Sequence, residues 1–294
     1  MVQAPLPSVS VVVPAYNEAA HLGEQLRALA AQDYEGEVEV VLADNGSTDG
    51  TPDVARRVGA ELLPGLQVVD ASERPGPSVA RNAGWRAASG DLVLFCDADD
   101  VADHGWVRAM VAALETSALV GGRLEVETLN DADTLAWRSP PAQTHLPRAE
   151  GYLPFAMGSN MGVRADVLRS LGGFDEGLDR SGEEPDLCWR AQLAGETLVF
   201  APDAVVHYRL RRGLRPLLRQ QRHWGLGSVD LYTRFRDRGM PRSSTPAAVR
   251  HWLRLLLGAP VRLPSRAGRG VWASRVAYRW GRVRASVEHR TVYL

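Results

Sequence analysis

Residues 91–100 read Asp-Leu-Val-Leu-Phe-Cys-Asp-Ala-Asp-Asp, a continuous apolar run that ends in a cluster of carboxylates. A short apolar run of this kind is typical of a strand that is buried on both faces of a parallel sheet. Open parallel sheets bind their ligands just beyond the carboxyl ends of the strands. We therefore expect the acids at 97–100 to lie at a binding edge.

Similar runs recur on both sides of this stretch. Strands are predicted at 8–14, 38–43, 66–69, 119–128, 155–163 and 197–201. Helices are predicted after Asn17, which we expect to be the helix cap, and at 51–59, 79–88, 164–171, 184–194 and 214–236. Residues 129–154 are predicted to form a long loop that could be partly helical. Strands that alternate with helices at short intervals predict an α/β fold with a Rossmann-like, doubly wound, mostly parallel sheet.

The bulk composition predicts a folded protein of one large domain, alone or with an appendage. The 294 residues are 45% hydrophobic, with no apolar run of about 18 residues and no secretory-type start at 1–7. The two cysteines, Cys96 and Cys188, lie far apart, so we expect neither a disulfide framework nor a cysteine metal site. These features predict a cytoplasmic protein, which could work at the inner face of the membrane.

The charge is divided unequally along the chain. Residues 1–204 carry 14 arginines against 32 acids, residues 205–294 carry 20 arginines against 3 acids, and lysine is absent. Two interpretations stay open. The two parts could neutralise each other or simply be solvated, or the basic end could meet phosphates or an anionic membrane surface.

Three acid-bearing segments, 16–18, 44–46 and 97–100, each follow a predicted strand. Carboxylates that face one another at one edge repel unless a cation lies between them. Cations of the Mg²⁺ or Mn²⁺ type prefer such hard oxygen ligands. For the Asp97-Ala98-Asp99 segment alone, the alternative is a helix N-terminus at which acids are favoured by the helix dipole.

The order of the motifs carries more information than any one of them. Pro14-Ala-Tyr-Asn-Glu18, Asp44-Asn-Gly-Ser-Thr-Asp-Gly-Thr51, Ser78-Val-Ala-Arg-Asn-Ala-Gly84 and Asp97-Ala-Asp99 follow one another, and 171–176 and 182–190 come later. This ordered set resembles the family 2 glycosyltransferases of the GT-A fold, from residue 8 to about 235. The resemblance implies an inverting transfer of a sugar from a nucleotide diphosphate donor, most often a UDP-sugar, with Mn²⁺ or Mg²⁺ as cofactor.

The resemblance also implies roles for single residues. The nucleotide-binding residues would be Pro14, Ala15, Tyr16, Glu18, Asp44, Asn45, Arg81, Asp97 and Ala98, and the metal ligands Asp97, Asp99 and His207. Each has a plainer alternative. Asp44 could form an Asx-turn, Arg81 could lie on a helix surface, and His207 could be an ordinary core or surface histidine.

An inverting transfer is a single displacement in which the acceptor hydroxyl loses its proton, so a carboxylate must lie near that oxygen. Glu184 is the first candidate for this base, followed by Glu183 and Asp186. The family usually has Glu-Asp here, so the second position departs by one methylene. Acids at a helix N-terminus are the alternative. Gly158, Ser159, Asn160 and Trp189 are candidates for the acceptor pocket, with a tight turn and a core tryptophan as the plainer interpretations.

Residues 1–238 are predicted to form the catalytic domain, with a donor half at 1–103 and an acceptor half at 104–238. Residues 239–294 would be an arginine-rich helical extension. Gln220-Gln-Arg-His-Trp224 matches the Gln-x-x-Arg-Trp signature of processive synthases only in part, because His223 replaces Arg. We therefore expect a single addition, to a carbohydrate or lipid-linked acceptor, and no nucleic-acid partner.

The extension is predicted to contain helices at 247–257 and 271–287. Its second helix has an apolar stripe flanked by arginines, formed by Trp272, Val276, Trp280, Val283 and Val287 with Arg275, Arg279, Arg282 and Arg284. Such a helix could lie on a membrane surface, pack on the catalytic domain or form a dimer contact.

Two classes of protein compete with the transferase. A nucleotidyltransferase or a dehydrogenase would need a glycine-rich loop after a strand, which this sequence lacks. A non-catalytic nucleotide-sugar-binding or scaffolding protein of the same fold stays open as the main alternative.

Overall fold

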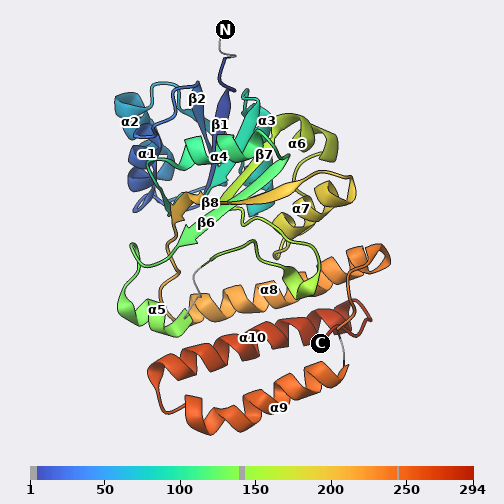
Figure 1. The fold of residues 1–294 in the computed structure, drawn as a ribbon. Helices are drawn as coiled ribbons and strands as arrows, with labels where there is room; N and C mark the ends of the chain where they lie inside the picture. Colours follow the sequence, from blue (N-terminus) through green and yellow to red (C-terminus); the bar gives the residue numbers. More distant parts are fainter. Residues whose placement is uncertain (1–4, 139–142, 244) are drawn as a thin grey trace.

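The computed structural model describes residues 5–138, 143–243 and 245–294 (Figure 1). Within these residues eight strands form one sheet. They are β1 (Val9–Ala15), β2 (Val38–Asp44), β3 (Gln67–Asp70), β4 (Leu92–Cys96), β5 (Val101–Ala102), β6 (Leu119–Glu125), β7 (Asn160–Arg164) and β8 (Leu198–His207). Their order in the sheet is β3-β2-β1-β4-β7-β6-β8-β5.

The sheet is parallel in its first half and mixed in its second. β3, β2, β1 and β4 run parallel, whereas β7 is antiparallel to both of its neighbours, β4 and β6. β8 returns parallel to β6, and the short β5 pairs antiparallel with β8. The predicted α/β fold with a mostly parallel sheet is confirmed.

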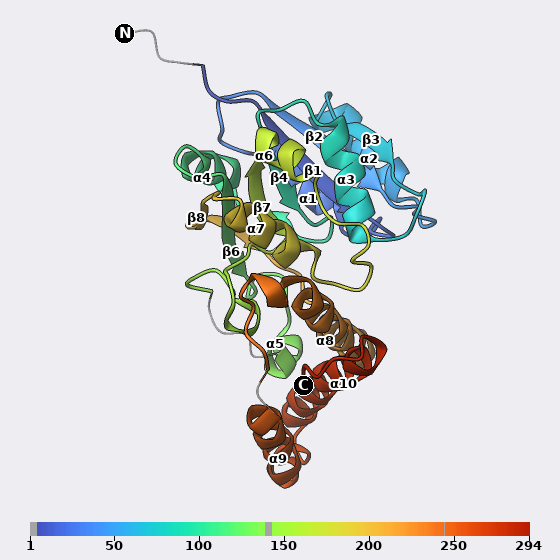
Figure 2. The same ribbon diagram turned by 90° about the vertical axis from the view of Figure 1, so that its right-hand side faces the viewer.

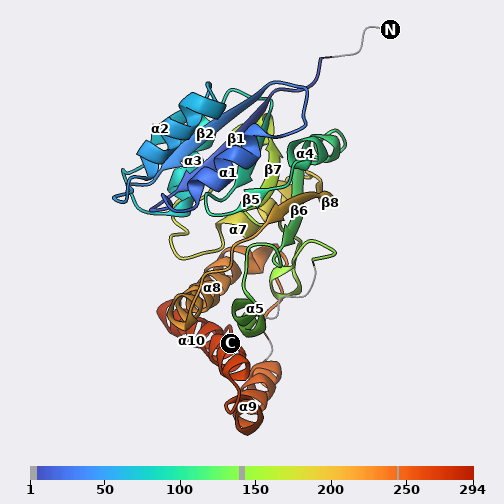
Figure 3. The ribbon, with the colours of Figure 1, turned by 90° about the vertical axis from the view of Figure 1, so that its left-hand side faces the viewer.

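Helices cover both faces of the sheet (Figures 2 and 3). The helices are α1 (Leu22–Ala30), α2 (Thr51–Leu62), α3 (Pro77–Ala87), α4 (Trp106–Leu114), α5 (Ala132–Arg138), α6 (Ala165–Leu171), α7 (Glu183–Leu193), α8 (Leu214–Phe235), α9 (Thr245–Arg262) and α10 (Arg266–Glu288). Successive side chains of a strand point to opposite faces. Accordingly, Val11 and Val13 pack with α1, α2 and α4, while Val12 packs with α6, α7 and α8.

Several boundaries differ from the sequence prediction, and two of them affect loops of the site. Asn17 does not cap α1, which begins at Leu22; it has φ 57°, and its Oδ1 accepts a hydrogen bond from the N–H of Thr48 at 2.8 Å. β7 begins at Asn160, not at Phe155, because 155–159 runs as a loop toward the site. The predicted loop at 129–154 contains α5 and a short 3-10 turn at Ala149–Gly151, and its residues 139–142 lie outside the described ones.

The C-terminal helices form a separate layer below the sheet in Figure 1, with α10 between α8 and α9. α10 packs against α8, α5 and α9. Gly225 of α8 and Gly281 of α10 let the two backbones approach so closely that a Cβ at either position would clash with the other helix. In the described part of the chain, no helix is long and apolar enough to cross a membrane.

Candidate active site

The acids that follow β4 lie close enough together to share a cation. One carboxylate oxygen from each of Asp97, Asp99 and Asp100 lies within 4.8 Å of the others. Asp100 is buried, and its Oδ1 accepts a hydrogen bond from the backbone N–H of Arg209 at 2.7 Å. Its Oδ2 is buried and lacks a hydrogen-bond partner among the described residues. The sequence placed Asp100 at the binding edge but not among the metal ligands, so its membership of this group is new.

Crowding and burial disfavour the charged forms of these acids. Burial and the Asp97 carboxylate raise the pKa of Asp99 to about 6. Burial and the Asp99 carboxylate raise the pKa of Glu18 to about 7 and that of Asp100 well above its usual value. A divalent cation would reverse this, because it stabilises every ionised carboxylate around it. The oxygen-only donor set and the unpartnered oxygen of Asp100 fit an ion of the Mg²⁺ or Mn²⁺ type.

His207 ends β8, where it pairs with Val101 just after this group, and it is not one of the described residues that form the group. Its Nδ1 lies 2.6 Å from Glu125 Oε2, and its Nε2 lies 3.8 Å from Asp103 Oδ2. Burial alone would raise the pKa of Glu125, but the hydrogen bond with His207 helps to lower it to about 2. An ionised Glu125 accepts the Nδ1 proton, so a neutral His207 keeps its lone pair on Nε2, the arrangement that metal-ligating histidines commonly have. Its predicted metal ligation stays a prediction.

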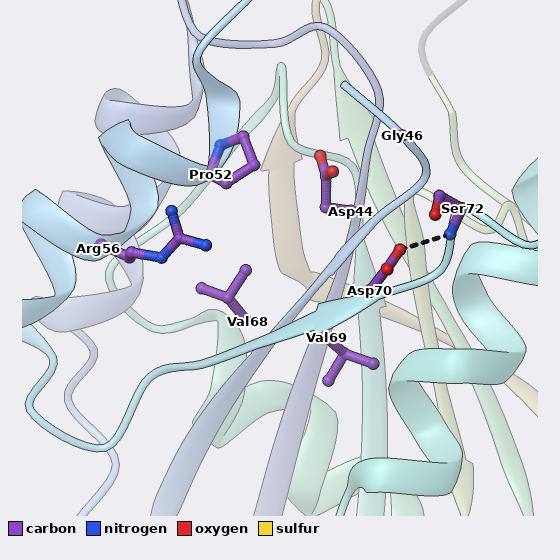
Figure 4. A pocket seen from close by; sticks show the side chains of 8 residues that line it. All are labelled: Asp44, Gly46, Pro52, Arg56, Val68, Val69, Asp70 and Ser72. Carbon is purple, nitrogen blue, oxygen red and sulfur yellow. Dashed lines mark hydrogen bonds between the residues drawn. The ribbon is translucent and has the colours of Figure 1, made fainter. Parts of the chain in front are cut away.

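A cavity of about 330 Å³ lies beside Asp44, at the carboxyl ends of β2 and β3 (Figure 4). Its lining consists of Asp44, Gly46, Pro52, Arg56, Val68, Val69, Asp70 and Ser72. Asp44 Oδ2 accepts a hydrogen bond from the N–H of Ser47, whereas Oδ1 is buried and unpartnered within the described residues. The lining is mixed, with the carboxylates of Asp44 and Asp70, the Arg56 guanidinium and the apolar side chains of Pro52, Val68 and Val69. Such a lining could hold a flat heterocycle with N–H groups on its edge.

Hydrogen bonds of the Asn45 side chain join the loops around this cavity. Both N–H groups of the Asn45 amide donate to carbonyls, those of Ala71 and Arg74, and its oxygen accepts from the N–H of Gly76. The side chain of Asn45 therefore holds the loops, so a direct contact with a nucleotide would fall to its backbone.

The remaining residues of the predicted nucleotide set differ in exposure. The side chains of Ala15 and Ala98 are buried, Pro14 is half-buried, and Tyr16 is exposed. The buried alanines could offer only backbone groups to a ligand. The exposed ring of Tyr16 is free to contact one.

Arg81 joins the predicted donor and acceptor sides of the site. It lies on α3 and is buried, with its Nη2 at 3.3 Å from Asp97 Oδ1. Its Nη1 lies 3.2 Å from Glu183 Oε1 and 3.6 Å from Glu184 Oε1. Burial alone would lower the pKa of Arg81, but these three carboxylates raise it above its usual value. A helix-surface position for Arg81, the alternative drawn from the sequence, is wrong.

The three candidate bases differ in their surroundings. The Asp186 side chain is fully buried and paired with Arg190 at 2.7 Å and Arg234 at 3.0 Å, which makes it structural and corrects its place among the bases. Glu183 is only 6% exposed and is tied to Arg81. Glu184 is 19% exposed, and burial together with the Glu183 carboxylate raises its pKa to about 7. A base needs access to the acceptor and a pKa near neutrality, which favours Glu184.

Gly158 has no side chain, and this leaves space for Arg81 and Glu184 beside it. A Cβ at this position would lie 2.6 Å from the guanidinium carbon of Arg81 and 2.9 Å from Glu184 Oε1. The neighbouring Ser159 is buried. These two predicted acceptor residues therefore lie next to the candidate base, although their contact with an acceptor stays a prediction.

Asn160 and Trp189 are core residues, which corrects their predicted place in the acceptor pocket. The Asn160 amide donates to the carbonyls of Arg123 and Ala204 and accepts from the Trp106 indole. The Trp189 ring is fully buried, with edge contacts to Tyr152 and Phe235. Neither side chain reaches a surface where an acceptor could bind.

Two residues of the site were not found from the sequence. Glu125 orients His207, and Arg209 binds the Asp99 carbonyl oxygen through its Nε at 2.8 Å. Glu125 ends β6 and forms no motif with His207, which lies 82 positions away. Only the pairing of β6 with β8 brings the two together.

Comparisons with known proteins identify the family of the chain. The family described as "Glycosyl transferase family 2" matches residues 10–172, and "Glycosyl transferase family group 2" matches residues 92–280. The chain is 31% identical over 232 residues to the glycosyltransferase AglE of Haloferax volcanii, covering 77% of this chain and 75% of that protein. It is 29% identical over 263 residues to the pre-mycofactocin glycosyltransferase of Mycobacterium tuberculosis, covering 85% of this chain but only 53% of that relative.

Solved structures share the fold. The mannosyltransferase PcManGT from Pyrobaculum calidifontis, in complex with GDP-Man and Mn²⁺, has a TM-score of 0.63 at 24% identity, covering 95% of this chain and 88% of its own. S. aureus TarS 1–349, in complex with UDP-GlcNAc, has a TM-score of 0.55 at 18% identity, and the match covers 98% of this chain and 93% of the TarS chain. The family match spans more than half of the chain, and the fold is that of GT-A enzymes. The chain belongs to glycosyltransferase family 2 and is a glycosyltransferase.

Proposed function

We propose that this enzyme transfers a sugar from a nucleotide diphosphate donor to an acceptor hydroxyl in one inverting displacement that depends on a divalent metal. The observation that carries the proposal is the convergence of Asp97, Asp99 and Asp100 at the end of β4. The Asp44 cavity lies at the same edge of the sheet. A nucleotide diphosphate requires a cation site for its diphosphate and a cavity for its nucleobase.

The donor would bind along this edge. The nucleobase would enter the Asp44 cavity, and the support for this is that Asp44 lines the cavity and that its buried Oδ1 lacks a hydrogen-bond partner among the described residues. Among the solved structures of this fold, one is a complex with GDP-Man and another with UDP-GlcNAc, so more than one base is compatible with the fold. A UDP-sugar is our first expectation for this chain.

Asp97, Asp99, Asp100 and His207 would hold Mn²⁺ or Mg²⁺. When bound, the ion would neutralise the charge that builds up on the diphosphate leaving group. Arg81 is occupied by three carboxylates, so its proposed role is to hold Asp97 on the donor side and Glu183 and Glu184 on the acceptor side in fixed positions.

Glu184 would remove the proton from the attacking hydroxyl. A pKa near 7 lets one carboxyl group be ionised before the attack and still be basic enough to take a proton. The proposed acceptor is a carbohydrate or a lipid-linked saccharide at the cytoplasmic face of a membrane, and one sugar is added per acceptor.

The test is the hydrolysis of UDP-, GDP- and dTDP-sugars in the presence of Mn²⁺, with the anomer of the released sugar read by NMR. We expect one donor class to be hydrolysed with inversion and Asp99→Ala to lose this activity. Asp237→Ala changes an 88% exposed surface acid and serves as the matched control. Equal rates in Asp99→Ala and the wild type would remove Asp99 from the proposed metal site.

A further inference from the structure

The outermost helix of the molecule, α9, has an uncovered apolar side. One side of α9 packs on α10, where Ala248 and Leu255 are buried and the Trp272 indole donates to the Leu255 carbonyl oxygen at 2.9 Å. All three views place α9 at the far edge of the helical layer, away from the sheet (Figures 1, 2 and 3). Its other side therefore faces outward.

This outward side carries a continuous stripe, which we call the α9 stripe. It consists of Val249, Leu253, Leu256, Leu257 and Val261, which are 52%, 48%, 64%, 78% and 82% exposed. Positions 249, 253, 256 and 257 follow the i, i+4, i+7, i+8 spacing of one helix face. Single exposed apolar residues are common on protein surfaces, but a contiguous set marks an interaction surface.

The segment that carries the stripe is strongly basic. Residues 239–294 contain 11 arginines and a single acid, Glu288. Glu288 is itself paired with Arg180 and Arg284. Arg250 and Arg254 are exposed on α9, where they follow Val249 and Leu253 directly in sequence. An apolar stripe bordered by arginines matches an anionic bilayer, whose acyl region accepts the leucines and whose phosphates accept the guanidinium groups.

The membrane-facing stripe expected from the sequence lay on α10. Trp280 and Val287 of that helix are exposed, but Trp272, Val276 and Val283 are partly covered because α10 lies between α8 and α9. The structure thus moves the outward apolar surface to α9, whose leucines the sequence alone left unassigned.

We propose that α9 lies in the headgroup region of an anionic lipid bilayer, with the α9 stripe inserted and Arg250 and Arg254 against lipid phosphates. This goes beyond the proposed transfer reaction and does not depend on the donor site. It gives the enzyme a way to work at a lipid surface while its catalytic edge stays in water.

The test is co-sedimentation of the 294-residue chain with vesicles of phosphatidylglycerol and phosphatidylcholine, compared with phosphatidylcholine alone. We expect binding to the anionic vesicles that weakens at high salt. Leu256→Asp combined with Leu257→Asp should lower the vesicle partition coefficient by more than about tenfold, because two leucines that would insert into the bilayer are lost. Leu62→Asp changes an exposed leucine at the end of α2 and should bind as the wild type does.

Nucleotide-sugar hydrolysis and thermal unfolding of each variant show that the fold is retained and keep this proposal separate from the proposed reaction. Failure of the wild type to bind anionic vesicles would overturn the proposal, as would equal binding by the double variant. If light scattering instead shows a dimer that the double variant breaks, with no vesicle binding, a second copy of the chain covers the stripe and the proposal is wrong.

Discussion

Arg81 is the residue on which the two sides of the site depend. Its guanidinium contacts Asp97 on the donor side and Glu183 and Glu184 on the acceptor side, and it is buried among them. Removing one partner of a buried ionic cluster leaves the other charges without compensation, which costs far more than breaking a surface pair.

We predict that Arg81→Met lowers the free energy of unfolding by about 3–5 kcal/mol. The control is Arg86→Met, which removes a half-exposed arginine from the same helix and should cost no more than about 1 kcal/mol. Urea unfolding at pH 7.5 measures both. Equal losses in the two variants would show that the buried cluster contributes no more than a surface pair.

Glu184 is predicted to act as the general base. Glu184→Gln keeps the size of the side chain but cannot take a proton, so kcat should fall by about 10²–10⁴-fold while donor binding is retained. A base must be deprotonated, so the wild-type rate should rise with pH and level off above about 7. The pH–rate profile tests this, and a variant that keeps the rising limb with its midpoint near 7 would exclude Glu184.

At the residue scale, the sequence was a better guide to the acidic residues of the site than to its amide and aromatic residues. Asp97 and Asp99 follow an apolar strand, so their place at the sheet edge follows from the strand alone. Asn160 and Trp189 look equally suited to an acceptor pocket, but their burial depends on β6, β8 and the 152–155 loop. Those contacts are long-range and leave no local pattern.

At the scale of elements, the turn before β7 brings backbone against the catalytic cluster. Gly158 lies there without a side chain, and Arg81, fixed by three carboxylates, has little freedom to move away. The close approach, not an unusual backbone angle, is what requires glycine at this position.

Gly158→Ala should therefore lower the unfolding free energy by about 1–3 kcal/mol and reduce turnover, because the added methyl group displaces Arg81 or Glu184. Gly65→Ala is the matched control, since a Cβ there meets nothing within 4 Å in the described part of the chain. Its effect should stay within about 0.5 kcal/mol. Thermal unfolding and donor hydrolysis give both readouts, and a neutral Gly158→Ala would contradict the packing described for the site.

The strands of the first half were predictable because β1, β2 and β4 are apolar on both faces. The start of β7 was not, since Phe155 and Ala156 continue the apolar run although their backbone forms no ladder. Likewise, Asn17 is a reasonable helix cap by residue type. Its amide bonds to Thr48 in a distant loop instead, and this tertiary contact overrides the local preference.

For the whole molecule, the acids of the site make stability depend on pH. Asp99, with a pKa of about 6, and Glu18 and Glu184, with pKa values of about 7, all titrate above their unfolded values. The folded state thus binds more protons than the unfolded state. The contribution of these three acids to the free energy of unfolding is therefore full below about pH 4 and is lost as the pH rises through 6 to 7. Glu125, with a pKa lowered to about 2, has the opposite effect: its contribution to stability is present above about pH 4.5 and is lost as the pH falls toward 2.

Without metal, stability should therefore fall between pH 5 and pH 7.5, and Asp99→Asn should make this fall smaller. Mn²⁺ should raise the melting temperature more at pH 7.5 than at pH 5, because it binds the ionised carboxylates. Melting curves at the two pH values, with and without Mn²⁺, measure this. A larger metal effect at pH 5 would be inconsistent with an acid-lined cation site.

The central claim is that the acids at the end of β4 hold a cation that in turn holds a nucleotide diphosphate. The most direct test is calorimetric titration of UDP, GDP and dTDP into the wild type, Asp99→Asn and the surface control Asp237→Asn, with and without Mn²⁺. The account predicts that one nucleotide binds tightly only with Mn²⁺, that Asp99→Asn abolishes this binding, and that Asp237→Asn leaves it unchanged. Equal binding by Asp99→Asn, or no nucleotide binding under any condition, would contradict it.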